Sequence, residues 1–205
     1  MPGRGKVWAD KLLHDYHGIV QCDAYPGYQH IDAPNRKGGL GTPAFCWSHA
    51  RRYFVEAARG GNAPIADEAL KCIARLFEIE RRIRGSNPEE RLVVRQAEAK
   101  PLLEEFRAWL ETKRRKMYRG PPTAEAIGYM FNQWDGLTRF LEDGRIDLST
   151  NAVERSMRPI ALQRKNALFA GHDLGAENWA VIASLIETLQ AQRTQSAGLP
   201  RRRPA

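Results

Sequence analysis

Long apolar segments and regularly spaced cysteines are both missing from this sequence of 205 residues. No run of 18 or more apolar residues occurs, and the N-terminus lacks the apolar core of a secretory signal peptide. The cysteines are three in number and irregularly spaced (Cys22, Cys46 and Cys72), so they do not form a disulfide framework. Such sparse use of cysteine is typical of a reducing compartment. We therefore expect a soluble, cytoplasmic protein with no membrane partner.

Acidic residues are also fewer than basic ones. The chain has 32 lysines and arginines against 24 aspartates and glutamates, which leaves a net charge of +8. Because the basic residues are spread along the whole chain, the charge predicts a polyanionic partner and says nothing about the fold. The length suffices to bury a real core. Residues 1–11 and 191–205 are expected to be disordered.

The first part of the chain has the pattern of α/β structure. The apolar run Gly18–Ala24 ends at a turn with proline and glycine, and its length favours a buried strand. Asp23 would then lie at the C-terminal end of this strand. The segment Asp32–Pro43 is rich in glycine and proline, which predicts a loop. A second short strand is predicted at Phe45–Trp47, followed by a helix over Ser48–Arg59.

The middle of the chain, residues 65–144, is predicted to be entirely helical. Apolar residues recur at helical spacing in three segments, which are Asp67–Arg84, Asn87–Tyr118 and Thr123–Gly144. Asn87 and Thr123 are expected to cap the second and third helices, and Pro101 is expected to kink the second. This block separates two α/β pieces, at residues 12–59 and 145–190.

The C-terminal piece is predicted to mix strands and helices. Arg145–Leu148 has the pattern of a short strand, and Ala167–Ala170 that of an apolar sheet edge. Ser149–Asn166 should contain a helix, and Gly175–Gln190 has the spacing of an amphipathic one.

Asp23 and Glu154 are the two acids most suited to a metal site. One ends a strand and the other opens a helix, so the two carboxylates could converge on divalent cations, which prefer oxygen ligands. Simpler roles remain open for both. Asn151 and Glu154 have the spacing of a capping box, and Asp23 precedes a proline–glycine turn. Spacing alone favours these simpler roles, because caps and turns are far commoner than metal sites.

Basic side chains and one C-x-x-H motif lie near the proposed acids in the sequence. Cys46 and His49 form a single pair with no second pair at zinc spacing, so a zinc site is not expected. A nuclease-type site needs cations to hold the phosphates of its substrate against the carboxylates. The residues that suit this role are Arg51, Arg52, Arg155, Arg158, Arg164 and Lys165.

Five separate motifs resemble one known family. In order they are GIVQCDAYPGY, CWSHARRYF, NQWDGLTRFLEDG, NAVERSMRPIALQRKNALFAG and SLIETL. Their order and spacing resemble those of the transposases of bacterial insertion sequence 66. The resemblance covers about Leu12 to Gln190, and several motifs in the right order make chance a poor explanation.

The resemblance implies a DDE transposase catalytic domain with a ribonuclease-H-like fold and a helical insertion before its last acid. In that family three acids hold two magnesium ions, which activate water and then a 3′-hydroxyl for DNA cleavage and strand transfer. Asp23 matches the second acid and Glu154 the third. Cys46 and His49 match a C-x-x-H signature with a structural or substrate-positioning role. The basic residues around Glu154 match positions that would contact the DNA backbone.

The first acid of the family has no match. Asp10 and Asp15 are too close to Asp23 for the intervening strands, each of which takes about five or six residues plus turns. We therefore expect an α/β, helix-rich, partial ribonuclease-H-like fold that is derived from a truncated transposase, has an incomplete magnesium site and is inactive alone. Its expected partners are transposon-end DNA and either a second copy or other transposase components. The alternatives are a catalytically silent DNA-binding or oligomerisation protein and a decayed product that folds poorly.

Overall fold

The structure, a computed structural model, describes residues 11, 13–24, 28, 31–32, 41–118, 120–166, 175, 178–186 and 188–189, with only the backbone described for 159–166. The chain divides into two compact units, Met1–Thr150 and Asn151–Ala205, and each is described by itself. The disorder expected for residues 1–11 and 191–205 and the apolar edge expected at 167–170 lie almost wholly outside the described residues. None of the helices that the structure describes is long and apolar enough to cross a membrane.

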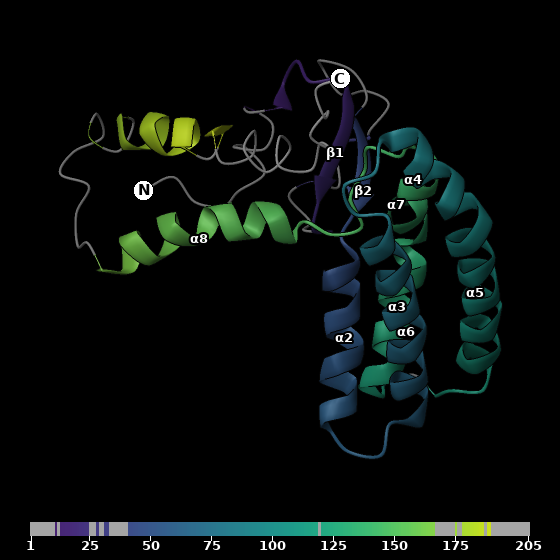
Figure 1. The fold of residues 1–205 in the computed structure, drawn as a ribbon. Coiled ribbons are helices and arrows are strands. Elements are labelled where there is room, and N and C mark those ends of the chain that lie inside the picture. Colours follow the sequence, from purple (N-terminus) through teal and green to yellow (C-terminus); the bar gives the residue numbers. More distant parts are fainter. Residues whose placement is uncertain are drawn as a thin grey trace. The chain divides into compact units, whose positions relative to one another are not determined.

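Two parallel strands stand at the start of the first unit. β1 (Gly18–Cys22) pairs with β2 (Gly41–Phe45) so that Gly18 is opposite Gly41 and Cys22 is opposite Phe45 (Figure 1). The prediction of the first strand is confirmed. The predicted limits of the second are wrong, because β2 begins inside the glycine- and proline-rich segment. Proline lacks an N–H donor but fits an edge strand, and among the described residues β2 pairs with β1 alone, so Pro43 is accommodated.

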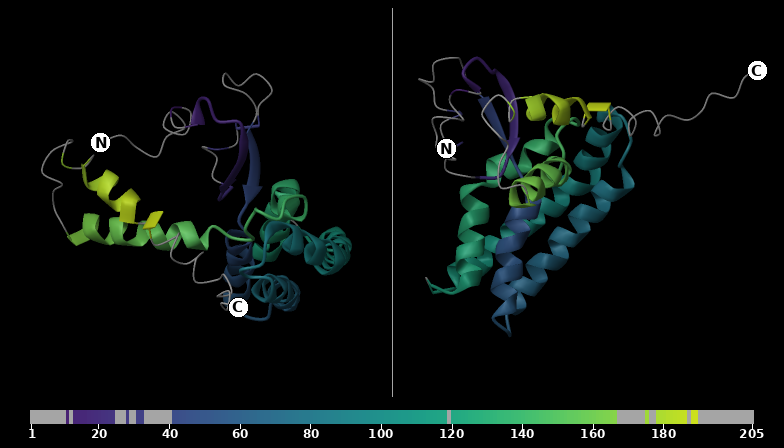
Figure 2. Two further views of the ribbon diagram at one scale, coloured as in Figure 1. Left: turned by 45° about the horizontal axis from the view of Figure 1, so that its top comes forward. Right: turned by 90° about the vertical axis from the view of Figure 1, so that its left-hand side faces the viewer.

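The helix predicted after β2 is confirmed as α2 (Trp47–Arg59). Its buried residues recur every three or four positions, at Trp47, Ala50, Phe54 and Ala57, and so form one apolar face. This face packs against α3 (Pro64–Arg82) and α6 (Pro122–Asn132), which lie beside α2 in Figures 1 and 2. This face of α2 therefore belongs to the apolar cluster of the first unit.

A nearly continuous helical path follows α3. Asn87 caps α4 (Pro88–Val94), since its side-chain oxygen accepts a hydrogen bond of 2.8 Å from the backbone N–H of Glu90. This confirms the predicted cap. A π-helical turn (Arg95–Ala99) then leads into α5 (Lys100–Arg115). The interruption comes just before Pro101, where the missing N–H makes a regular helix costly.

The helix predicted over Thr123–Gly144 is wrong in two respects. The residue preceding α6 is Pro121, so Thr123 lies inside the helix and is not its cap. The helix ends at Asn132 and is followed by α7 (Trp134–Thr138) and a 3-10 turn (Arg139–Leu141). Close packing against β2 occurs at this break: a Cβ added to Gly136 would lie 2.2 Å from the ring of Phe45. Helical periodicity in the sequence did not reveal this long-range contact.

The strand predicted at Arg145–Leu148 is also wrong, since these residues form a turn and bends. The segment nevertheless lies beside β1 and α2. The side-chain amide of Gln21 donates to the backbone carbonyl of Asp147 and accepts from its N–H, and the backbone N–H of Trp47 donates to the carbonyl of Leu148 at 3.0 Å. The apolar pattern of this segment reflects the burial of Ile146 and Leu148.

Arg95 is a fully buried cation at the centre of the connection between the helices and this segment. Its guanidinium forms a two-pronged ion pair with Glu80, with N···O distances of 2.7 and 2.8 Å, and lies over the ring of Phe140 at 5.1 Å from the ring centroid. It also donates to four backbone carbonyls at 2.8–3.4 Å, those of Phe140, Asp143, Gly144 and Ile146. The Arg95 side chain thereby fixes the backbone path from Phe140 to Ile146, after α7.

The second unit contains α8 (Asn151–Asn166), as the sequence predicted. Asn151 is the first residue of α8 and Glu154 lies in its first turn. The described residues between 175 and 189 are all helical, which confirms the amphipathic helix predicted there for those residues.

Candidate functional site

Asp23 directly follows the last residue of β1 and is partly exposed. The carboxyl ends of parallel strands meet at one edge of a sheet, which is where ligands of α/β proteins commonly bind. At this edge burial raises the pKa of the Cys22 thiol to about 12, and the charges of Asp23 and Cys46 raise it further. Asp23 and Cys46, which directly follow β1 and β2, therefore both lie within electrostatic reach of Cys22.

Cys22 should consequently resist alkylation in the folded protein. A thiol pKa near 12 leaves about a thousandfold less thiolate at pH 8 than an ordinary cysteine pKa near 9 does, and the thiolate is the reactive form. We expect iodoacetamide to modify Cys72, which is partly exposed, well before Cys22. Peptide mass mapping over a time course would measure this order, and faster labelling of Cys22 than of Cys72 would contradict it. In urea the two should react at similar rates.

The C-x-x-H pair lies at the junction of β2 and α2. Cys46 is buried, and its sulfur accepts a hydrogen bond of 3.3 Å from the backbone N–H of Thr150. The carbonyl of Cys46 accepts from the backbone N–H of His49 at 3.2 Å, within the first turn of α2. Among the residues that the structure describes, no group of three metal-binding side chains is found. The contacts of Cys46 join the end of β2 to the residue that precedes α8.

An aromatic pair that the sequence analysis missed lies close to Asp23. The ring of Tyr53 on α2 stacks on that of Tyr129 on α6, with centroids 4.2 Å apart and planes inclined by 26°. Burial raises the pKa of the Tyr129 phenol to about 12, and further contributions come from Tyr53, Asp23 and the two cysteines. The sequence holds one signal that could have drawn attention to Tyr53. Tyr53 lies four residues after His49, so the two residues share one face of α2.

The basic residues predicted to contact DNA come from both units. Arg51 and Arg52 are exposed on α2, and Arg155 and Arg158 are exposed on α8. Arg164 and Lys165 belong to α8, but their side chains lie outside the described set. Glu154 is exposed in the first turn of α8. Because the two units are described separately, the convergence of Asp23 and Glu154 stays a prediction.

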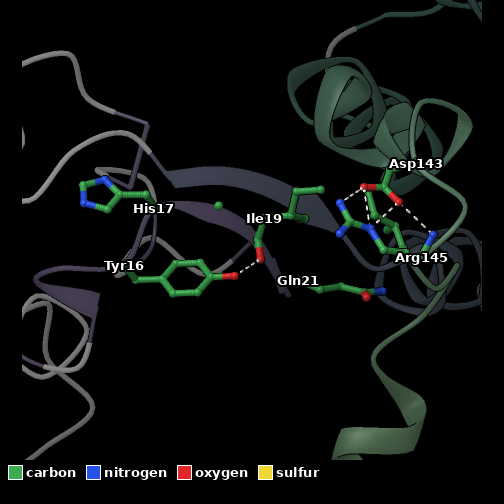
Figure 3. A pocket seen from close by; sticks show the side chains of 8 residues that line it. Tyr16, His17, Ile19, Gln21, Asp143 and Arg145 are labelled. Carbon is green, nitrogen blue, oxygen red and sulfur yellow. Dashed lines mark hydrogen bonds and ion pairs between the residues drawn. The ribbon is translucent and has the colours of Figure 1, made fainter.

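A pocket of about 500 Å³ lies beside β1 and does not include the predicted site residues. It is lined by eight residues (Figure 3), which are Tyr16, His17, Gly18, Ile19, Gln21, Asp143, Arg145 and Ile146. Arg145 forms ion-pair contacts of 2.5 to 3.1 Å with Asp143, and this hydrogen-bonded pairing lowers the pKa of Asp143 to about 2. The charge of Arg145 is thus balanced locally, and this arginine was not among the predicted DNA contacts.

Comparison with known proteins identifies the family. Residues 1–178 match the sequence profile described as "Transposase IS66 family". Three curated proteins of Sinorhizobium fredii strain NGR234 are similar to this chain. The uncharacterized protein y4hP is 43% identical over 190 residues, which is 87% of this chain and 34% of that protein. The uncharacterized protein y4jD is 38% identical over 183 residues, covering 88% of this chain and 36% of that protein.

The third relative, the uncharacterized protein y4qI, is 34% identical over 190 residues, or 91% of this chain and 35% of that protein. The chain thus spans about a third of the length of the curated relatives it matches. No solved structure matches it. Since the family profile covers most of the chain, and the motifs around Asp23, Cys46 and Glu154 fall within the matched range, this protein belongs to the IS66 family of transposases.

Proposed function

We propose that the chain is part of the catalytic domain of a DDE-type DNA transposase with a ribonuclease-H-like fold, in which Asp23 and Glu154 are metal-binding acids. One observation carries the proposal: Asp23 directly follows the first of two parallel strands, where the carboxyl ends of β1 and β2 meet. Family membership supports it, because transposases of this class generally use divalent metal ions. The helices between residues 64 and 141 form the insertion between the two acids.

The chemistry of the two acids suits magnesium. Mg²⁺ prefers carboxylate oxygens and keeps several waters, so a few accessible carboxylates can hold it. Asp23 is partly exposed and Glu154 is exposed, so both carboxylates can reach an ion from solvent. When bound, the ion would supply positive charge that favours deprotonation of an attacking water or hydroxyl. The protein's own part is to present Asp23 on a strand end and Glu154 on a helix.

Exposed arginines would hold the phosphates of the DNA. Arg51 and Arg52 follow the C-x-x-H motif on α2, and Arg155 and Arg158 follow Glu154 on α8. Each proposed acid thus has two exposed arginines within its own unit, on α2 for Asp23 and on α8 for Glu154. Phosphate contacts of this kind supply sequence-independent affinity and make it dependent on salt. Arg164 and Lys165 are proposed as further contacts on α8.

Calorimetric titration with Mn²⁺, which binds the same oxygen ligands as Mg²⁺, tests the metal site. We expect Asp23→Asn and Glu154→Gln each to weaken the binding of Mn²⁺ by about tenfold or more, because each removes a charged ligand. Glu89→Gln is the matched control. Glu89 is also an exposed acid in the first turn of a helix, α4, and its substitution should leave Mn²⁺ binding unchanged.

Equal binding by all four proteins would contradict the metal site and favour a catalytically silent DNA-binding protein. A loss caused by only one of the two substitutions would contradict a site that Asp23 and Glu154 share. Circular dichroism of each variant should match that of the wild type, since neither carboxylate is buried.

A further inference from the structure

We infer that the stacked pair Tyr53 and Tyr129 is a base-stacking platform that takes an unpaired nucleobase of the DNA, next to Asp23. This inference rests on the proposed function, because it assigns a substrate contact within the same site. It concerns the bases of the DNA, whereas the arginines described above concern its phosphates. It also specifies that the bound nucleotide is single-stranded or turned out of the duplex.

The first observation is the exposure of one ring of the pair. Tyr129 is half-buried between the helices, whereas Tyr53 is 41% exposed. By contrast, Trp47 and Trp134, which meet edge to face with centroids 6.5 Å apart, are 0% and 7% exposed and belong to the core. The stacking on Tyr129 already restricts the ring of Tyr53, so little further conformational entropy is lost when a base binds. The exposed part of the Tyr53 ring can then receive a planar base.

The second observation is the chemistry around the pair. Tyr53 lies on α2, which begins at Trp47 just after the end of β2, and Asp23, the proposed metal-binding acid, directly follows the parallel neighbour β1. Arg51 and Arg52 immediately precede Tyr53 and are exposed on the same helix. Exposed cations and an exposed aromatic ring on one helix are the combination with which proteins hold single-stranded nucleic acid, the cations on phosphates and the ring on a base.

The third observation is the rigidity of the support. α2 packs against α6 through its buried face, and Ala50, Phe54 and Ala57 on α2 are at most 5% exposed. Tyr53 and Tyr129 therefore come from two helices that the core holds together. A base stacked on Tyr53 would be held at a constant position relative to the end of β1. Enzymes that act on DNA strands need such a fixed nucleotide beside the reacting phosphate.

The test compares two oligonucleotides that carry the same number of phosphates. One is a single strand of roughly 12 thymidines, and the other is an abasic strand of the same length. Fluorescence anisotropy would measure the affinity of the wild type, Tyr53→Leu, Tyr53→Phe and the double variant Arg51→Gln/Arg52→Gln for both. We expect the wild type to bind the thymidine strand about tenfold more tightly than the abasic strand.

Tyr53→Leu should lose most of this preference, whereas Tyr53→Phe, which keeps the ring, should retain it. The double arginine variant should bind both strands more weakly and keep the preference. If Tyr53→Leu binds the thymidine strand as tightly as the wild type does, the platform is wrong while the proposed function stands. If the wild type binds neither strand, the proposed DNA contacts fail together with the platform. Tyr53→Leu should fold normally, because the side chain is exposed.

Discussion

Replacing Arg95 with methionine is expected to lower the free energy of unfolding by about 3–5 kcal/mol, because it breaks a buried ion pair and leaves its partner charge behind. Arg95 is 0% exposed and the side chain of Glu80 is 11% exposed, so water cannot replace the lost guanidinium, and among the described residues Glu80 keeps only the longer contact of 3.7 Å to Arg91. The four carbonyls that Arg95 now satisfies would also lose a donor. Urea unfolding followed by circular dichroism would measure the change.

An exposed ion pair of the same residue types provides the control for Arg95. Arg82 is bonded to Glu98, and the two side chains are 48% and 44% exposed. Arg82→Met should barely move the urea midpoint, because solvent screens such pairs. The double variant Arg95→Met/Glu80→Gln should recover part of the loss, since it removes a buried carboxylate whose remaining cationic neighbour is Arg91 at 3.7 Å. A midpoint for Arg95→Met close to that of Arg82→Met would show that the buried arginine does not organise the chain after α7.

Replacing Trp47 with alanine is expected to cost about 3–5 kcal/mol of unfolding free energy, because it opens a large cavity in the core. Trp47 is fully buried at the start of α2, where its ring meets that of Trp134 edge to face. Its indole N–H donates a hydrogen bond of 2.7 Å to the carbonyl of Leu137 in α7. The same residue therefore connects the end of β2 to α7 by its side chain and to Leu148 by its backbone.

Trp47→Phe separates the hydrogen bond from the packing. It keeps an aromatic ring but leaves the carbonyl of Leu137 without its donor, so we expect a loss of roughly 1–3 kcal/mol for that group together with the smaller ring. Trp109→Ala is the control, because Trp109 is only partly buried on α5. Thermal unfolding of the three variants should rank Trp47→Ala as the least stable. A smaller effect for Trp47→Ala than for Trp109→Ala would contradict the central position of Trp47.

Several elements were predictable because their signals are local. The strand at Gly18–Cys22 is short, apolar and bounded by turn residues, and the helices from residue 47 to residue 115 carry apolar residues at helical spacing. The cap at Asn87 was predictable for the same reason, since it depends on residues three positions apart. The family was predictable from ordered motifs, and the match over residues 1–178 confirms it.

Other features depend on residues far apart in the chain. Helical spacing continues past Asn132, yet α6 ends there, and Gly136 in the following helix α7 packs against the ring of Phe45 in β2. The apolar pattern of Arg145–Leu148 matched that of a strand, yet these residues are held by the side chains of Gln21 and Arg95. The spacing of apolar residues indicates that a segment is buried. It does not specify which other element of the fold covers that segment.

The candidate site shows the same division. The sequence by itself determined the family, because the family is carried by contiguous motifs, and it predicted the acids Asp23 and Glu154 and the basic residues around them. Only the tertiary structure decided that Arg95 is buried on Glu80 and on carbonyls 45 to 51 residues away, and that Tyr53 stacks on Tyr129 near Asp23. The reason is physical: a side chain acquires its partners from elements that meet only after the core has packed.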